Sequence, residues 1–274
     1  MKVGIVGKGG TGKTTLSGLL CQAFVSRGRR VVAVDTDSNP NLALSLGLSE
    51  EAANTAPVIP RSLVVGSGGG AMSPAELLSE YGLRTPGGVT LLHAMRVDTA
   101  GAGCTCSSHA SVRSLLGAAI DDEADVTLVD MEAGLEHLSR SGGTLAYADV
   151  LLMVMEPTRK SIMTAARTVP LARELGIPRV YGIGNKAVLS ADAEMFATVS
   201  AQSGVPLGGV VPFDKVLCDS DRRGVAVPAG EAPDVRAAVD AIVELLESPD
   251  EERDALLRER ARVEERIAEL TTGA

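Results

Sequence analysis

The chain has 274 residues, of which 45% are hydrophobic, enough for one large α/β domain with a sizeable core or two small ones, and we favour one. A net charge of −9 and an aromatic content of 2% argue against a nucleic-acid surface. No apolar run is long enough to span a membrane and no signal-peptide pattern is present, so a cytoplasmic protein without a membrane partner is expected.

Short apolar runs rich in β-branched residues alternate along the chain with segments of helical periodicity. The predicted strands are 3–6, 31–34, 126–129, 150–155, 180–183 and 210–211. The predicted helices are 16–25, 74–81, 112–120, 162–175, 191–203 and 235–246. This alternation predicts a doubly wound α/β fold, with a mostly parallel sheet and helices on both faces.

Two stretches, 49–72 and 82–108, are rich in Gly, Ser, Thr and Pro and predict surface loops inserted into the domain. The domain is expected to cover residues 1–248, with these loop insertions at about 49–108. Residues 249–270 carry eight acids and five arginines, which predicts a charged, solvated helix within the tail 249–274.

A glycine-rich loop follows the first predicted strand and precedes the first predicted helix, as a phosphate-binding loop requires. Its backbone N–H groups and the helix N-terminus are expected to bind phosphate oxygens, Lys13 to reach the β and γ phosphates, and Thr14 to ligate Mg²⁺. The expected nucleotide-binding residues of the loop are Gly9, Gly10, Thr11, Gly12, Lys13, Thr14 and Thr15.

The same glycines also fit a dinucleotide fingerprint, Gly7-x-Gly9-x-x-Gly12, with Asp35 placed 23 residues after the last glycine as a ribose-binding acid. The lysine and threonine that directly follow favour a triphosphate, because a dinucleotide turn has no role for them.

Acidic residues follow two of the predicted strands, at the ends where parallel sheets bind ligands. Asp35 and Asp37 follow the second strand, and Asp130 follows the strand that begins at Val126. Asp130 is expected to hold Mg²⁺ through water and Asp37 to position the attacking water, while Gly134 would let a backbone N–H approach the γ-phosphate. A helix cap is the alternative for any one of these acids.

Two later segments are candidates for contact with the base. Asn185 and Lys186 follow a predicted strand and resemble the base-recognition Asn-Lys of nucleotide-binding proteins. Position 188 is Val where guanine readers carry Asp, which favours adenine. The segment Pro212-Phe213-Asp214 could close over the base, and a plain turn explains it equally well.

Cys104 and Cys106 lie one residue apart in a glycine-rich stretch. In a reducing compartment, two thiolates on one loop form half of a four-ligand soft-metal site, and a twofold dimer would supply the other half. His109 is near enough to be a third ligand, although a histidine at a helix start is more often a surface or capping residue. Cys21 and Cys218 are expected to be packing residues.

The loop from Lys8 to Thr15 resembles the deviant Walker A loop of the ATPase family that contains MinD, ParA and the nitrogenase iron protein. In that family the early lysine, here Lys8, reaches the nucleotide of the partner subunit. The segment 130–138 and the cysteine pair resemble the CooC type, ATPases that assist nickel insertion into carbon monoxide dehydrogenase.

The resemblance covers nearly the whole chain and implies an ATP-dependent metallochaperone that hydrolyses ATP. It implies a homodimer that binds Ni²⁺ or Zn²⁺ between two cysteine pairs and passes nickel to an apoenzyme. It brings no ligand role for Glu132, Glu136 and His137, which are expected to shape the loop after Asp130.

Two other functions stay open. A positioning ATPase of the MinD or ParA kind fits the shared loop, whereas the acidic charge and tail argue against it. An iron-sulfur carrier or reductase fits four thiolates. The nitrogenase iron protein, however, takes its second cysteine from after the Walker B strand, where this chain has no cysteine at 131–134.

Overall fold

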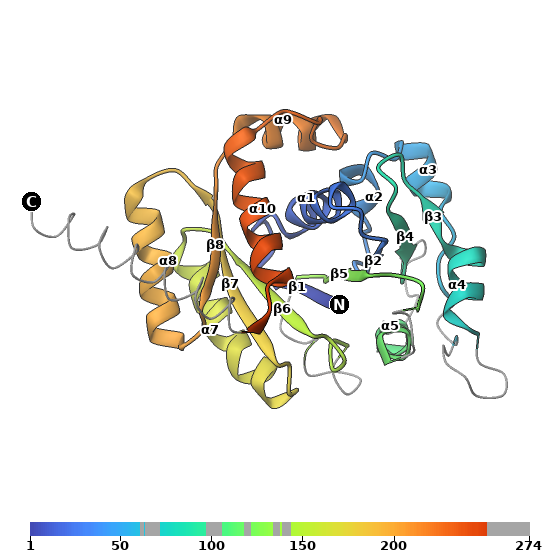
Figure 1. Cartoon of the computed structure of the whole chain (residues 1–274), viewed down its shortest axis with the longest axis horizontal. Coiled ribbons are helices and arrows are strands. Elements are labelled where there is room, and N and C mark those ends of the chain that lie inside the picture. The colour runs from blue at the N-terminus through green and yellow to red at the C-terminus, as the bar shows by residue number, and fades with distance from the viewer. Residues whose placement is uncertain are drawn as a thin grey trace, which may run out of the picture.

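The computed structural model describes residues 1–60, 63, 72–96, 106–117, 122–133, 138 and 144–250, with the backbone alone for 106–110. These residues form an eight-stranded sheet in the order β3-β4-β2-β5-β1-β6-β7-β8, parallel except that β3 runs antiparallel to β4 (Figure 1). The strands are β1 (Lys2–Gly7), β2 (Val31–Asp35), β3 (Leu83–Arg84), β4 (Thr90–His93), β5 (Val126–Asp130), β6 (Val150–Met155), β7 (Arg179–Ala187) and β8 (Leu207–Pro212).

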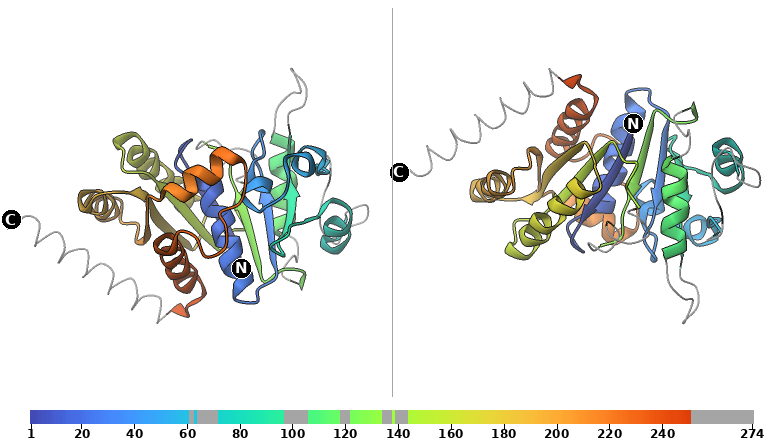
Figure 2. Two further views of the ribbon diagram at one scale, coloured as in Figure 1. Left: turned by 90° about the horizontal axis from the view of Figure 1, so that it is seen from above. Right: turned by 90° about the horizontal axis from the view of Figure 1, so that it is seen from below.

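Helices cover both faces of the sheet (Figure 2). The helices are α1 (Lys13–Ser26), α2 (Leu42–Ser45), α3 (Glu50–Thr55), α4 (Pro74–Tyr81), α5 (Cys106–Gly117), α7 (Arg159–Glu174), α8 (Ser190–Ser203), α9 (Lys215–Arg223) and α10 (Pro233–Glu247). In β2, Val31 and Ala33 pack into one core with α1 and α10, whereas Val32 and Val34 pack into the other with α5, α7 and α8. The doubly wound fold is therefore confirmed.

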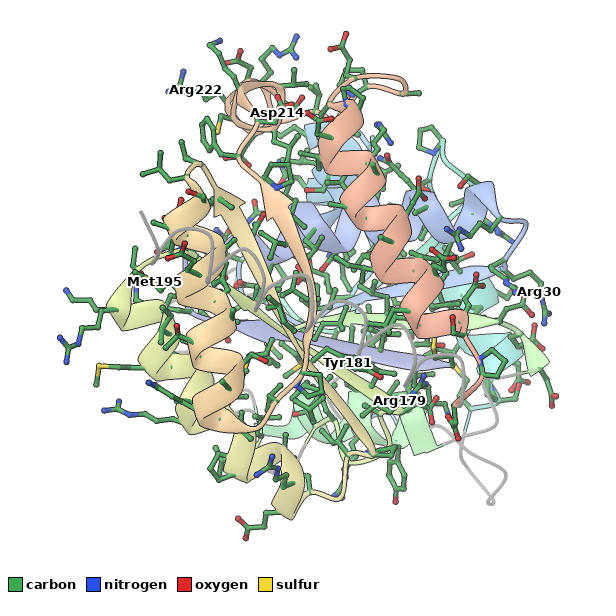
Figure 3. The ribbon with its side chains drawn as sticks, turned by 60° about the vertical axis from the view of Figure 1, so that its left-hand side comes forward. Arg30, Arg179, Tyr181, Met195, Asp214 and Arg222 are labelled. Carbon is green, nitrogen blue, oxygen red and sulfur yellow. The ribbon has the colours of Figure 1, made fainter. Side chains whose placement is uncertain are left out.

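The parallel strands all end at one edge of the sheet, so residues far apart in sequence meet there. β1 lies between β5 and β6, and its end leads through the glycine-rich loop into α1. Arg179 at the start of β7 and Asp214 just after β8 lie at opposite ends of these parallel strands (Figure 3). The candidate site therefore belongs to the Asp214 end.

The prediction of surface loops over 49–72 and 82–108 is wrong in part. β4 lies inside the sheet beside β2, and all four of its residues are buried. A run this short, directly after Gly87 and Gly88, has no clear strand periodicity, and its place comes from parallel pairing with β2. Within 49–72 a short helix, α3, is capped by Ser49, whose Oγ accepts a hydrogen bond from Ala52 N at 3.1 Å.

Other parts of these predicted loops, 61–62, 64–71 and 97–105, lie outside the described residues, as does the tail beyond residue 250. Among the helices that the structure describes, none is long and apolar enough to cross a membrane.

Candidate nucleotide site

The glycine-rich loop between β1 and α1 has the curled backbone that a phosphate nest requires. Gly10 and Gly12 have φ values of 83° and 88°, in the left-handed region that glycine adopts without strain. Thr11 closes a turn on Lys8, with its N–H 3.3 Å and its Oγ1 2.9 Å from the Lys8 carbonyl oxygen. The Leu16 N–H donates to Gly12 O at 2.9 Å, so α1 begins directly at the loop. Such a nest at a helix N-terminus suits phosphate.

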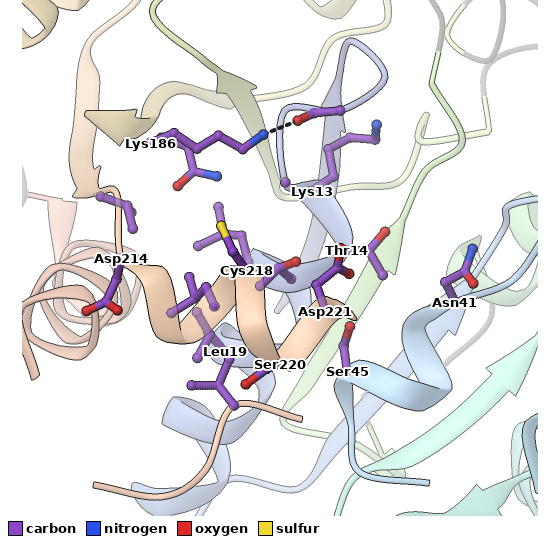
Figure 4. A pocket seen from close by; sticks show the side chains of 18 of the residues that line it. Lys13, Thr14, Leu19, Asn41, Ser45, Lys186, Asp214, Cys218, Ser220 and Asp221 are labelled. Atoms are coloured by element: carbon purple, nitrogen blue, oxygen red, sulfur yellow. Dashed lines mark hydrogen bonds between the residues drawn. The ribbon is translucent and has the colours of Figure 1, made fainter. Parts of the chain in front are cut away.

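A cavity of about 610 Å³ opens beside this loop, within the range of small-ligand sites (Figure 4). Lys8, Thr11, Asp35 and Asp130 do not line it, and Gly134 lies outside the described residues. The predicted site residues that do line it are Gly9, Gly10, Gly12, Lys13, Thr14, Thr15, Asp37, Asn185, Lys186, Pro212, Phe213 and Asp214.

Lys13 is buried at the start of α1, and its Nζ donates to Lys8 O at 3.4 Å. Burial lowers the pKa of the Lys13 ammonium, and the nearby carboxylates of Asp130, Asp37 and Glu132 oppose that shift. The lysine is therefore a cation with weak loop contacts of its own, suited to meeting phosphate oxygens in the cavity.

Asp130 ends β5 beneath the loop, and its Oδ1 accepts a hydrogen bond from Ser17 Oγ at 3.0 Å. Its carboxylate also accepts from the Thr14 hydroxyl, which brings together the two oxygen groups that were predicted to serve Mg²⁺. Burial raises the pKa of Asp130, while these two bonds and Lys13 hold it down. The residues present therefore fit a nucleotide with its Mg²⁺.

Asp35 lies opposite Asp130 in the register of β2 and β5, and it is buried. Its Oδ2 accepts from Leu42 N at 2.9 Å and its Oδ1 from Asp37 N at 3.0 Å, so it fixes the turn into α2. Burial first, and then the Asp130 charge, raise the pKa of Asp35. Asp37, two residues on, reaches the cavity wall.

Glu132 accepts a hydrogen bond from Ser38 Oγ at 3.1 Å. This bond joins the segment after β5 to the segment after β2, in line with the expectation that Glu132 shapes the loop after Asp130. Glu136 and His137 lie outside the described residues.

Asn185 and Lys186 reach the cavity wall from β7, but both side chains donate to the P-loop. Asn185 Nδ2 lies 2.8 Å from Thr11 O, and Lys186 Nζ donates to Gly10 O (Figure 4). Close packing here also explains Gly12, because a Cβ at that position would lie 2.5 Å from Asn185 Nδ2.

Sequence reasoning missed α9, which forms another wall of the cavity with Cys218, Ser220 and Asp221 (Figure 4). The residues at both ends of α9 are typical of helix boundaries and could have been recognised in the sequence. Asp214 caps its start by accepting from Val216 N at 2.7 Å, and Gly224 ends it with a φ of 61°. Phe213, one residue before the cap, is 49% exposed at the rim.

Of the cysteines, Cys106 is the first residue of α5, and Cys104 lies outside the described residues. Cys21 is fully buried in the core, as predicted, and burial raises the pKa of its thiol. In the described part of the chain, no group of three or more His, Cys, Asp or Glu residues is placed to hold a metal ion.

Residues 4–227 match the family model described as the CobQ/CobB/MinD/ParA nucleotide binding domain. The chain belongs to this family. It is an ATPase of that group, in agreement with the geometry of Lys13, Thr14 and Asp130.

Two relatives match most of the chain. The carbon monoxide dehydrogenase accessory protein CooC of Rhodospirillum rubrum is 34% identical over 239 residues, 82% of this chain and 89% of that protein. An uncharacterised ATP-binding protein of Methanocaldococcus jannaschii is 35% identical over 237 residues, covering 82% and 90%. The predicted resemblance to the CooC type is thus confirmed.

Solved structures share the fold of this ATPase. MinD of Pyrococcus horikoshii, complexed with Mg-ADP, superposes with a TM-score of 0.68 at 19% identity, covering 90% of this chain and 96% of that one. Cobyrinic acid a,c-diamide synthase of Mycobacterium smegmatis gives 0.65 at 22%, covering 90% and 95%.

Proposed function

We propose that this ATPase is a metallochaperone of the CooC type. Its ATP-driven homodimer binds Ni²⁺ or Zn²⁺ between two pairs of Cys104 and Cys106 and assists nickel insertion into a carbon monoxide dehydrogenase. The observation that carries the proposal is the Cys-x-Cys sequence at the start of α5 in a chain 34% identical to the R. rubrum accessory protein. Four thiolates from two subunits would form a tetrahedral soft-metal site.

The fold supports coupling between the nucleotide and the cysteines. The Thr36 N–H donates to Asp130 O at 3.0 Å, and the Ala94 N–H donates to Asp35 O at 2.9 Å. Ala94 begins the connection from β4 to α5, which carries Cys104. Backbone hydrogen bonds therefore connect Asp130, the proposed Mg²⁺ acid, through the end of β2 to the start of the connection that carries Cys104.

At its far end this connection meets a well-anchored helix. Val112, Leu115 and Leu116 of α5 are buried against the sheet. The part of α5 that follows the cysteine pair is therefore fixed against the sheet.

The proposed dimer rests on Lys8. Lys8 is half-buried in the glycine-rich loop, and none of the ion pairs among the described residues includes it. An ammonium in this position can meet the phosphates of a partner subunit.

The test is metal content of anaerobically purified protein, with and without ATP. The proposal expects about one Ni²⁺ or Zn²⁺ per dimer, and tighter binding with ATP. The double variant Cys104→Ala with Cys106→Ala should lose the metal and keep ATP binding, whereas Ser108→Ala in the same stretch should keep both. Unchanged metal stoichiometry in the double variant would refute the proposal.

The same preparation separates the alternatives. A brown, iron-containing cluster that needs Cys104 would favour an iron-sulfur carrier. Tight ATP-dependent sedimentation with anionic vesicles or DNA would favour a positioning ATPase.

A further inference from the structure

Glu156 directly follows β6, whose residue Val154 pairs with Gly7 at the start of the P-loop. Its Oε2 lies 3.5 Å from Lys186 Nζ, and its Oε1 accepts from the Thr158 hydroxyl at 3.4 Å. Its own N–H donates to Ser161 Oγ at 3.1 Å. Backbone and carboxylate are thus both held where α7 begins, which fixes the carboxylate beside Lys186.

Lys186 has a φ of 60°, a left-handed conformation that a residue with a side chain seldom adopts. Along a regular strand, Asn185 and Lys186 would point to opposite faces of the sheet. The left-handed residue breaks that alternation, and both side chains reach the P-loop. They bind successive carbonyl oxygens, Asn185 that of Thr11 and Lys186 that of Gly10.

Holding these two carbonyls sets the direction of the loop amides. In a trans peptide the N–H points opposite to the C=O, and the structure contains no cis peptide in the described chain. With Thr11 O held toward β7, the Gly12 N–H points away from β7. With Gly10 O held, the Thr11 N–H faces Lys8 O and closes the turn.

The lysine could not hold its carbonyl reliably alone. Its side chain is 41% exposed, and a long exposed ammonium has many solvated rotamers. The Glu156 side chain is 21% exposed and its carboxylate restricts that ammonium to the P-loop side. Glu156 itself does not line the nucleotide cavity, so any effect on nucleotide must pass through Lys186.

We infer that Glu156 is a positioning residue of this ATPase, which holds Lys186 Nζ on Gly10 O and so keeps the P-loop shaped for phosphate. The loop shape serves the phosphates of ADP and ATP alike. Loss of Glu156 therefore weakens binding of both nucleotides by the same factor and leaves kcat largely unchanged.

The test is a double-mutant cycle of Glu156→Gln and Lys186→Met, with Kd measured for Mg·ATP, Mg·ADP and Mg·tripolyphosphate. Glu156→Gln should raise all three Kd values roughly two- to fivefold, the range for a partly exposed ion pair. In the Lys186→Met background the same change should have no further effect. Glu174→Gln, an exposed glutamate at the far end of α7, is the matched control.

Charge reversal distinguishes positioning from a plain ion pair. Glu156→Lys with Lys186→Glu restores an ion pair but removes the donor to Gly10 O, so the inference expects no recovery of nucleotide affinity. Recovery, or an equal effect of Glu156→Gln with and without Lys186, would overturn it. Measurements on the Cys104→Ala, Cys106→Ala variant keep this result independent of the proposed metal function.

Discussion

The Nδ2 atom of Asn185 lies 2.8 Å from the carbonyl oxygen of Thr11, and this buried hydrogen bond joins the end of β7 to a P-loop 174 residues earlier in the chain. An amide in this place can also face a base. The bond nevertheless gives Asn185 a task that does not depend on the base, namely holding the loop that receives the phosphates.

Replacing Asn185 by Asp sets a carboxylate against a carbonyl oxygen, so two acceptors face each other. This should weaken Mg·ATP binding about 10- to 100-fold, the equivalent of about 1–3 kcal/mol, and Asn185→Ala should cost less. The decisive comparison uses Mg·tripolyphosphate, which has no base. Equal losses for both ligands support the loop role, loss for ATP alone would show base recognition instead, and Asn54→Ala on exposed α3 serves as control.

Ser17 donates to Asp130 Oδ1 at 3.0 Å from within α1, and it is completely buried. Ser17→Ala removes one of two hydroxyl donors that orient Asp130, the proposed Mg²⁺ acid, so ATP hydrolysis should slow by about 3- to 10-fold, whereas ATP affinity should change less than about twofold. Ser26→Ala tests the same change at the exposed end of α1, where the hydroxyl donates only to Ala23 O. Equal rates in the two variants would contradict a role for Ser17 in placing Asp130.

The P-loop and its acid could be predicted from sequence because each lies in a short local pattern. Lys13 and Thr14 follow their glycines directly, and Asp130 closes an apolar run at the edge where parallel strands bind ligands. The chemistry and the backbone geometry are encoded in the same few residues.

The role of Glu156 and the direction of the Lys186 side chain could not be predicted in this way. Their contact depends on the positive φ of Lys186. It also depends on the pairing of two neighbouring strands, which brings together residues 30 positions apart in the sequence. Glu156 directly follows an apolar strand, much as Asp130 closes one, and this similarity was a signal that the sequence offered. β4 was missed because its identity as a strand depends on pairing with β2, a tertiary effect.

His93 ends β4 beside Asp35, fully buried, and neither ring nitrogen has a hydrogen-bond partner among the described residues. Burial first, and then the Arg96 charge, lower its pKa from 6.5 to about 4. Because the unfolded histidine takes up a proton first, His93 protonation does not affect the free energy of unfolding above pH 6.5 and lowers it progressively as the pH falls toward 4.

We therefore expect the free energy of unfolding of the wild type to fall by about 2 kcal/mol more than that of His93→Leu between pH 7 and pH 4.5. Asp35 and Asp130, whose raised pKa values act in the opposite direction, are common to both proteins and cancel in the difference. At pH 7.5 the variant should be at least as stable as the wild type, because leucine removes two unpaired polar atoms. Parallel urea-unfolding series would detect this, and identical pH profiles would show that His93 is not the titrating group.

Lys8 is the residue that would link the nucleotide site of one subunit to the other. Lys8→Ala should leave monomer affinity for ATP within about twofold, because Lys13 and the loop amides remain, while ATP-dependent dimerisation weakens about tenfold or more through loss of a charge-assisted contact to phosphate. Sedimentation velocity with a non-hydrolysable ATP analogue measures the dimer, with Lys160→Ala on exposed α7 as a lysine control.

If metal binding depends on that dimer, Lys8→Ala should also weaken metal affinity at low protein concentration, and raising the concentration should restore it. If this variant dimerises as tightly as the wild type, Lys8 has no role in dimerisation, and the cysteine pairs lose their proposed link to ATP.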